Sequence, residues 1–563
     1  MSRLKLGSSF KSFVPGFLPG LAPCLGAAVA LTMASGCLEH PLKPVELEKG
    51  QEVVRQLELT VNKDVDILFM IDNSGSMGPV QANLGANFPA FIEVLEAEDV
   101  QANYRIGITT SDNGNLWCPG TTPEAGNLVM SSCKSRIGDF IFGGTVDVQD
   151  LACNDICNLT EAELEVLPTI TDEDSTPKPR PWFESIEGKK NIPAATDAAA
   201  AFACFGPQGI NGCGFEAQLE SMYLALTRAQ TSTEASYGFL RASAILAIVL
   251  VTDEVDCSHN KMWSEIFATD GNKEFWSDPT APFPTSAICW NAGVECEPGA
   301  DPNSYASCES VNKDVNGNIG VSDEAAVLRP MNRYIGLVQG IEDAKKSIND
   351  TQEVIVALIG GVPSNGDIFY NDIGHIDPAF QNEFGIGPGC ESADLSIRAL
   401  APVRMRDLTN AFTQDNMFSI CDNNYSPALL AIANIIKSQI KPACYSECVK
   451  DVDSSTPEVV PECTVEAKVP GVDGSIRMEE CRRDANGYVI NPETNDYTMP
   501  GDNVNVCYAA LTNPNDMSQE CLDQSYNLEF KIARRPGFPA AGGTSISANC
   551  SLADFPDISC PGI

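Results

Sequence analysis

The alternation of apolar runs with amphipathic segments between residues 64 and 440 constrains the fold most strongly. Continuous apolar runs are typical of buried strands in parallel sheets, whereas apolar residues every three to four positions indicate helices. The expected strands are 65–71, 104–110, 244–251, 353–359 and 418–420. The expected helices are 80–97, 215–229, 328–348, 401–412 and 427–440. This order predicts an α/β fold, with a doubly wound, mostly parallel sheet and helices on both faces.

Two long stretches, at about residues 112–200 and 254–325, interrupt this alternation. Each holds four cysteines, and together they hold all five tryptophans of the chain. We interpret both stretches as disulfide-rich insertions into a sheet domain of residues 61–443. Their tryptophans suit either an interface or small local cores, and the sequence leaves this choice open. Residues 444–563 carry turn signals and short alternating runs, which predict a small cysteine-rich β region.

The cysteine count and the net charge define the compartment and restrict the partners. Twenty-two irregularly spaced cysteines favour disulfides in an oxidising compartment. Twelve lie between Cys118 and Cys421 and eight between Cys444 and Cys560, so each set can close internally. The formal net charge of −40 repels phosphate, which excludes nucleic acid as a partner.

The N-terminus predicts export and a lipid anchor. Three basic residues among the first eleven precede an uncharged stretch that ends in small residues before Cys37. Residues 1–36 resemble a bacterial lipoprotein signal peptide, which implies that Cys37 becomes the lipid-modified first residue. Residues 37–60 are polar, and we interpret them as a tether between the lipid and the folded part of the chain. Leu38 is not the Asp associated with inner-membrane retention, so we expect the outer membrane or cell surface. Plain secretion and an uncleaved membrane anchor are the alternatives.

Polar residues follow two of the expected strands at their carboxyl ends, where open α/β sheets bind ligands. Asp72-x-Ser74-x-Ser76 follows the strand at 65–71, and Asp253 follows the strand at 244–251. A carboxylate and two hydroxyls on one tight loop offer the hard oxygen ligands that Mg²⁺ prefers. The sequence therefore predicts a metal site here. The alternative is that these side chains merely cap the next helix.

This pair of motifs resembles the von Willebrand factor type A (VWA) domain and its metal-ion-dependent adhesion site. The resemblance covers about residues 64–440, and residues 212–216, 239–241 and 252–258 are similar to a subgroup of bacterial surface lipoproteins. It implies that Asp72, Ser74, Ser76 and Asp253 bind Mg²⁺, Mn²⁺ or Ca²⁺. It also implies an open coordination position, which a Glu or Asp of a partner protein fills.

The resemblance is incomplete at the third ligand of the family, a threonine in a loop before a helix. The corresponding residues, 210–216, contain no threonine. Glu216 is one candidate to supply the missing oxygen. Thr145, which follows two glycines within the first insertion, is another, and water is a third.

Several other polar residues carry weaker signals. Residues 312–323 approximate an EF-hand loop, but a hairpin turn at Asn316-Gly317 explains them better. Glu254 and Asp256 are expected to be loop caps or solvated charges. His259 and His375 have no paired ligands nearby in the sequence and are expected at the surface.

The expected function is that of a lipid-anchored cell-surface binding or adhesion module that recognises a carboxylate of a partner protein through a bound metal. No nucleophile–base set is evident in the sequence, so we do not expect an enzyme. The alternatives are a structural envelope lipoprotein with a vestigial metal site and, less favoured, a metal-assisted hydrolase.

Overall fold

The computed structural model describes residues 55–59 and 63–560, with gaps at 98–99, 101, 187, 349–351, 441–442, 457, 469–473, 485–486, 493–495 and 536–544. The predicted signal peptide, Cys37 and the first part of the predicted tether lie outside the described residues. Within these ranges, no helix is long and apolar enough to cross a membrane.

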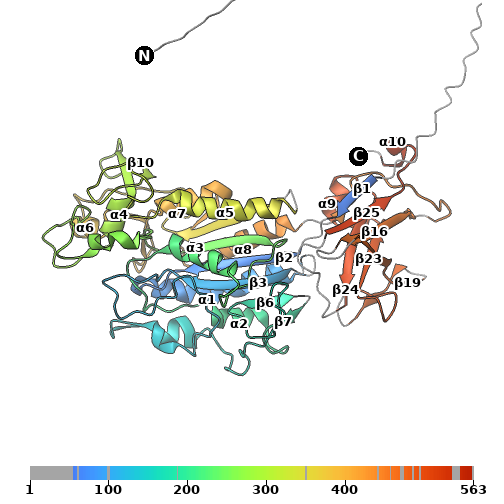
Figure 1. The fold of residues 1–563 in the computed structure, drawn as a ribbon, viewed down its shortest axis with the longest axis horizontal. Coiled ribbons are helices and arrows are strands. Elements are labelled where there is room, and N and C mark those ends of the chain that lie inside the picture. The colour runs from blue at the N-terminus through green and yellow to red at the C-terminus, as the bar shows by residue number, and fades with distance from the viewer. Residues whose placement is uncertain are drawn as a thin grey trace, which may run out of the picture. The chain divides into compact units, whose positions relative to one another are not determined.

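A seven-stranded sheet forms the centre of the larger domain, in the order β14-β11-β8-β2-β3-β6-β7. Figure 1 labels β2, β3, β6 and β7 of this sheet. The first five strands in this order are parallel, and β6 and β7 complete one edge as antiparallel strands. The predicted α/β class is confirmed. The strands are β2 (Asp64–Ile71), β3 (Asn103–Thr110), β6 (Phe183–Ile186), β7 (Lys189–Lys190), β8 (Ile245–Val251), β11 (Ile355–Gly360) and β14 (Met417–Ser419).

Helices cover both faces of this sheet because the central strands alternate apolar side chains between two cores. In β2, Phe69 packs with α1 (Gly78–Glu96), α2 (Ala198–Phe205) and α8 (Ser426–Gln439). Leu68 points to the opposite face, which packs on α3 (Gln218–Ala229), α5 (Met331–Lys346) and α7 (Val403–Phe412). Both residues are fully buried, as expected for a strand in the middle of a doubly wound sheet.

The first insertion is smaller than the sequence suggested. Residues 112–200 were expected to lie outside the sheet, but their last part contributes β6, β7 and the start of α2 to the domain. These elements span four, two and eight residues, too short for periodicity to reveal them. The remainder is mostly irregular and includes the hairpin β4 (Ile141–Phe142) and β5 (Val146–Asp147).

The second insertion has a core of its own, which also recruits residues 361–403. Trp276 and Trp290 are buried in this core together with Phe267 and Leu400. Trp263 is partly buried against the same core. Trp182 is buried in the main core of the sheet domain, and Trp117 is 41% exposed. Three of the five tryptophans therefore belong to the local core of the second insertion. The elements are η4 (Lys261–Phe267), α4 (Ala287–Gly293), β9 (Val294–Pro298), β10 (Tyr305–Ser310), α6 (Pro378–Phe384), β12 (Pro388–Glu391) and β13 (Arg398–Leu400).

The C-terminal region is β-rich, as predicted, and is built on two four-stranded sheets ordered β1-β25-β16-β17 and β15-β24-β23-β18. Two short helices and two short hairpins complete it. One hairpin pairs β19 (Arg483–Asp484) with β20 (Gly487–Tyr488), and the other pairs β21 (Ile490–Asn491) with β22 (Asp496–Tyr497). The principal strands and the helices are β15 (Ala443–Cys444), β16 (Cys463–Lys468), β17 (Ile476–Arg477), β18 (Glu479–Glu480), β23 (Val506–Leu511), β24 (Glu529–Arg534), β25 (Ser545–Cys550), α9 (Gln519–Asp523) and α10 (Pro556–Ser559).

One strand of this region comes from the predicted tether. β1 (Arg55–Leu59) pairs antiparallel with β25 over five residues, from Arg55 opposite Cys550 to Leu59 opposite Ile546. The tether assignment is therefore wrong for residues 55–59. Its partner strand lies nearly 500 positions away in the sequence, so local pattern gives no sign of the pairing.

The cysteines pair as the even counts predicted, within each of the two sets. Six disulfides lie between Cys118 and Cys421, and four lie between Cys444 and Cys560. The disulfide Cys118–Cys213 links the loop after β3 to the loop before α3, which holds the residues described in the next subsection.

Candidate metal centre at the carboxyl edge of the sheet

Asp72 lies at the end of β2 as the buried base of a polar cluster. Its Oδ1 accepts hydrogen bonds from the Ser74 amide (2.9 Å) and the Ser111 hydroxyl (3.0 Å), and its Oδ2 accepts one from the Thr252 hydroxyl (2.5 Å). The Asp72 backbone is fixed as well, since its carbonyl accepts from Gln81 Nε2 at 2.7 Å. Three donors therefore hold this carboxylate in one orientation.

Ser74, Ser76 and Asp253 form an arc of oxygens beside Asp72. Ser74 Oγ and Ser76 Oγ are 3.1 Å apart, and Ser76 Oγ donates to Asp253 Oδ1 at 3.2 Å. Asp253 reaches this position because β8 is the neighbour of β2 and the two strands end level, with Ile71 opposite Val251. The structure thus brings together the four residues that the sequence selected.

The helix-capping alternative does not account for these residues. Ser74 precedes the short 3₁₀ turn η1 (Gly75–Met77), yet its side chain makes no capping hydrogen bond there. Helix α1 follows directly from Met77, again without a side-chain cap. The two serine hydroxyls are directed at each other and at Asp253 instead.

Glu216 lies in the same cluster, at the end of the loop that precedes α3. It is 2% exposed, and its backbone carbonyl accepts from the Cys257 amide at 2.7 Å. The loop approaches the serine motif closely, since the Gly212 amide donates to the Asn73 carbonyl at 2.7 Å. A β-carbon on Gly212 would lie 2.2 Å from Asn73 Oδ1, so a larger residue here would displace the loop or the Asn73 side chain.

Burial raises the pKa of four carboxyl groups in this cluster, and the charges of neighbouring carboxylates raise three of these pKa values further. Burial and then the charge of Asp72 raise the pKa of Asp253 to about 7 and that of Glu216 well above its ordinary range. Burial followed by the charges of Asp253 and Asp72 does the same to the pKa of Glu254. Burial also raises the pKa of Asp72, although its hydrogen bonds oppose this. A bound cation would offset the repulsion between these buried carboxylates.

The chemistry and the spacing of the oxygens fit a small divalent cation. Octahedral Mg²⁺ with ligands at about 2.1 Å places neighbouring oxygens about 3.0 Å apart, close to the separations along the arc. Within the described ranges, no three His, Cys, Asp or Glu side chains are arranged to hold a metal by themselves. A cation here would therefore depend on the hydroxyls of Ser74 and Ser76 as well as on Asp253.

Thr145, the other candidate for the third ligand, lies in the exposed turn of the β4–β5 hairpin. The adjacent Phe142 does reach the motif: a β-carbon on Gly75 would be 2.7 Å from its ring. Of the two candidates, Glu216 is the one whose carboxyl shares a charge environment with Asp72 and Asp253.

Sequence reasoning missed several residues that complete the cluster. Ser111 directly follows β3, the strand beside β2, so its place at the same sheet edge was the available signal. Thr252 lies in the segment 252–258 noted above, but the sequence assigned it no role. Its hydroxyl donates to Asp72 and accepts from Gln218 Nε2 at 2.9 Å. The expectation that Glu254 is a loop cap or solvated charge is wrong: its Oε2 is buried, accepts no hydrogen bond from the described residues, and lies close enough to feel the charges of Asp253 and Asp72.

The weaker predictions have mixed outcomes. Asp256 is a cap, as expected, accepting from the Leu219 amide of α3. Asp314 of the EF-hand-like loop accepts from the amides of Asn316 and Asn318 in a turn, as the hairpin interpretation requires. His259 is 6% exposed, so its predicted surface position is wrong. It packs edge-on against Phe267 of the second insertion, a contact invisible in the sequence.

No protein-family model matches the sequence, and no curated protein is detectably similar to it. The solved structures that match this chain include the pilus adhesin SpaC of Lactobacillus rhamnosus GG in an open conformation. The sequence identity is 12% and the TM-score is 0.25, and the match covers 88% of this chain and 40% of SpaC. The vWF domain of the type V pili tip protein Mfa5 of Porphyromonas gingivalis is also similar, at 12% identity and a TM-score of 0.27. The match covers 68% of this chain and 98% of that domain. At these scores, function must be argued from the residues of this chain.

Proposed function

We propose that this chain is a lipid-anchored cell-surface binding module that recognises a partner protein through a divalent cation at the carboxyl edge of its sheet. The observation that carries the proposal is the arc of Ser74, Ser76 and Asp253 oxygens at 3.1 and 3.2 Å beside buried Asp72. Mg²⁺, Mn²⁺ or Ca²⁺ would supply a Lewis-acidic position for a partner's carboxylate.

The residues of the chain hold this arrangement rigid. Asp72 is oriented by three donors, and Asp253 is placed by the pairing of β8 with β2. Glu216 brings a further carboxyl from a loop that Cys118–Cys213 ties to the loop after β3. Ser76 is solvent-exposed, so a ligand can approach the arc from its side.

The location at the cell surface rests on independent features. The lipoprotein-like sequence before Cys37 supports export and anchoring. Ten disulfides require an oxidising compartment. We propose the outer membrane or outer surface of a bacterial envelope.

A hydrolase is the weaker alternative, and one contact bears on it. His259 Nε2 and Ser264 Oγ are 3.3 Å apart, the spacing of a nucleophile and its base. Burial and the charge of Lys261 lower the pKa of His259 to about 4, which makes it a weak base at neutral pH. The Ser264 hydroxyl already donates to the Lys261 carbonyl at 2.9 Å. A structural envelope protein with a vestigial site is the second alternative.

Titration calorimetry with MgCl₂ and MnCl₂ tests the proposal. We expect the wild-type protein to bind one cation, Asp72→Ala to bind none, and Ser76→Ala to bind about tenfold or more weakly. Ser76 is exposed, so its loss leaves the core intact. Ser438→Ala, an exposed serine on α8, is the matched control. Equal isotherms for wild type and both site variants would refute the metal site and favour the structural alternative.

A further inference from the structure

A polar pocket of about 480 Å³ lies between α3, the segment around residues 260–262 and the segment 323–333. This volume falls in the range of small-ligand sites, roughly 300–1,000 Å³. The residues around it that matter here are Tyr223, Met262, Glu324, Arg329, Asn332 and Arg333. None of them belongs to the metal centre.

Arg329 is the feature of this pocket that points to a ligand. Its Nε is buried without a hydrogen-bond partner, and among the described residues no carboxylate forms an ion pair with it. Its backbone is fixed, since its amide donates to the Ser258 carbonyl at 2.8 Å and its carbonyl accepts from Arg404 Nη2 at 2.6 Å. A guanidinium remains charged and donates from five N–H groups, and the half-buried Arg329 lines the pocket, so it can donate to an acceptor bound there.

The neighbouring cations already have their partners. Arg333 donates to both oxygens of Glu220 at 2.9 Å, and its guanidinium stacks 3.6 Å from the centre of the Tyr223 ring. Lys261 donates to the carbonyl of Asn113 at 2.7 Å and to that of Gly114. Of these three cations, Arg329 is the one left for a ligand.

The pocket also offers an acceptor and an apolar contact. Asp323 of its lining accepts from Asn332 Nδ2 at 2.8 Å. The exposed Glu324 carboxylate accepts no hydrogen bond from the described residues. Met262 is 77% exposed at the edge of the pocket. A ligand that pairs with Arg329, donates to Glu324 and contacts Met262 therefore carries a carboxylate, a nearby hydrogen-bond donor and an apolar side chain.

We propose that this pocket binds the α-carboxylate end of an amino acid or of a peptide. Arg329 donates its N–H groups to the carboxylate, and Glu324 accepts the adjacent ammonium or amide N–H. Met262 contacts the apolar side chain. The Glu324 carboxylate in the lining suits a carboxylate with an adjacent N–H donor better than an anion that lacks one.

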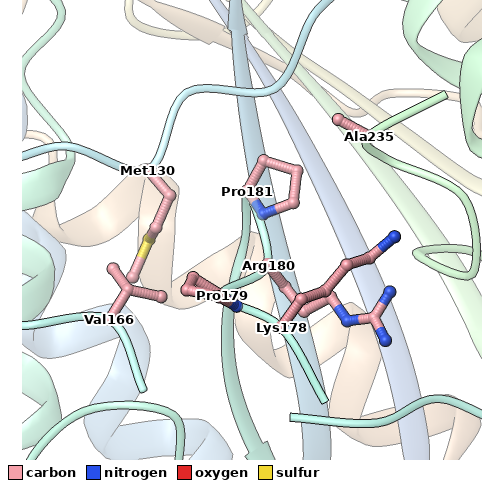
Figure 2. Close-up of a pocket in the computed structure, with 7 residues that line it drawn as sticks. All are labelled: Met130, Val166, Lys178, Pro179, Arg180, Pro181 and Ala235. Carbon is pink, nitrogen blue, oxygen red and sulfur yellow. The ribbon is translucent and has the colours of Figure 1, made fainter. Parts of the chain in front are cut away.

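A second pocket, of about 280 Å³, differs in that its cations are paired. Figure 2 shows Lys178 and Arg180 among the residues that line it. Its Arg180 donates to Asp174 Oδ2 at 3.0 Å and to the carbonyls of Thr169 and Thr176. Lys178 pairs with the same Asp174 at 2.8 Å. Its cations need no ligand, so this pocket carries no proposal.

Calorimetric titration of the protein in EDTA, which silences the metal centre, tests the proposal with three probes. N-acetyl-leucine presents a peptide terminus, leucine a free amino acid, and N-acetyl-leucinamide lacks the carboxylate. We expect one or both carboxylate probes to bind and the amide to bind at least about tenfold more weakly. Binding of leucine alone would identify a free amino acid, and binding of N-acetyl-leucine alone a peptide terminus.

Variants then assign the binding to Arg329. Arg329→Gln is expected to lose at least about tenfold in affinity and Arg329→Lys somewhat less, because lysine keeps the charge but not the planar fork. Arg228→Gln, on α3 and paired with Glu234, is the matched control. Asp72→Ala is expected to bind the probes normally, which separates this site from the metal centre. Binding of the amide as tight as the acid, undiminished binding by Arg329→Gln and Arg329→Lys, or no binding of either carboxylate would overturn the proposal.

Discussion

Replacing Asp253 by Asn is expected to stabilise the metal-free protein at neutral and alkaline pH. Asp253 is buried near Asp72, and burial followed by that charge raises its pKa from 3.8 to about 7. Asparagine has nearly the shape of the protonated carboxyl group but never ionises. The substitution therefore removes the cost of holding a charge here without opening a cavity.

The expected magnitude follows from the two pKa values. A carboxyl whose pKa is higher in the folded protein contributes stability below pH about 4, and this stability is lost as the pH rises through about 7. The difference of about three between the folded and unfolded pKa values corresponds to about 4 kcal/mol. We expect wild type and Asp253→Asn to be equally stable near pH 4, and the variant to be more stable by up to that amount at pH 8.

Differential scanning calorimetry in EDTA between pH 4 and 8 measures this difference, with the exposed Asp270→Asn as a control expected to follow wild type. Saturating Mg²⁺ should restore the stability of wild type at pH 8 and leave Asp253→Asn unchanged, because the cation binds the folded wild type alone. A wild-type transition that keeps the same offset from Asp253→Asn at every pH would refute the electrostatic reasoning.

Three further changes test other contacts. Gly212→Ala should weaken Mg²⁺ binding in calorimetry, because its β-carbon would lie 2.2 Å from Asn73 Oδ1; unchanged binding would show that the loop yields freely. Arg241→Met should destabilise the sheet domain by roughly 3–5 kcal/mol in thermal unfolding, since it leaves the buried Asp66 carboxylate without its 2.8 Å partner. Deleting residues 51–59 should expose the edge of β25 and cause aggregation in light scattering, and a monodisperse deletion variant would contradict this.

The central strands and most of their covering helices could be predicted because each is long and carries its own pattern. The apolar run at 244–251 lies within one residue of β8, and the run at 65–71 within one residue of β2. The short elements β6 and α2 were assigned to an insertion, because four or eight residues carry too little periodicity.

The candidate site divides in the same way. Asp72, Ser74, Ser76 and Asp253 follow strands at positions where a parallel sheet collects them, so sequence alone could select them. Ser111 hydrogen-bonds Asp72 from the next strand, and Glu254 joins the charged cluster; neither was selected. Their roles depend on distances between loops, which no single segment encodes.

The α/β alternation, the two self-contained sets of cysteines and the polar residues at the strand ends could all be predicted, because each is a local pattern of burial or chemistry. Only the folded chain shows which cysteines pair, that β1 joins β25, and that Arg329 Nε is left without an acceptor. These outcomes depend on which surfaces meet after folding. That is set by the packing free energy of the whole chain, to which any single segment contributes little.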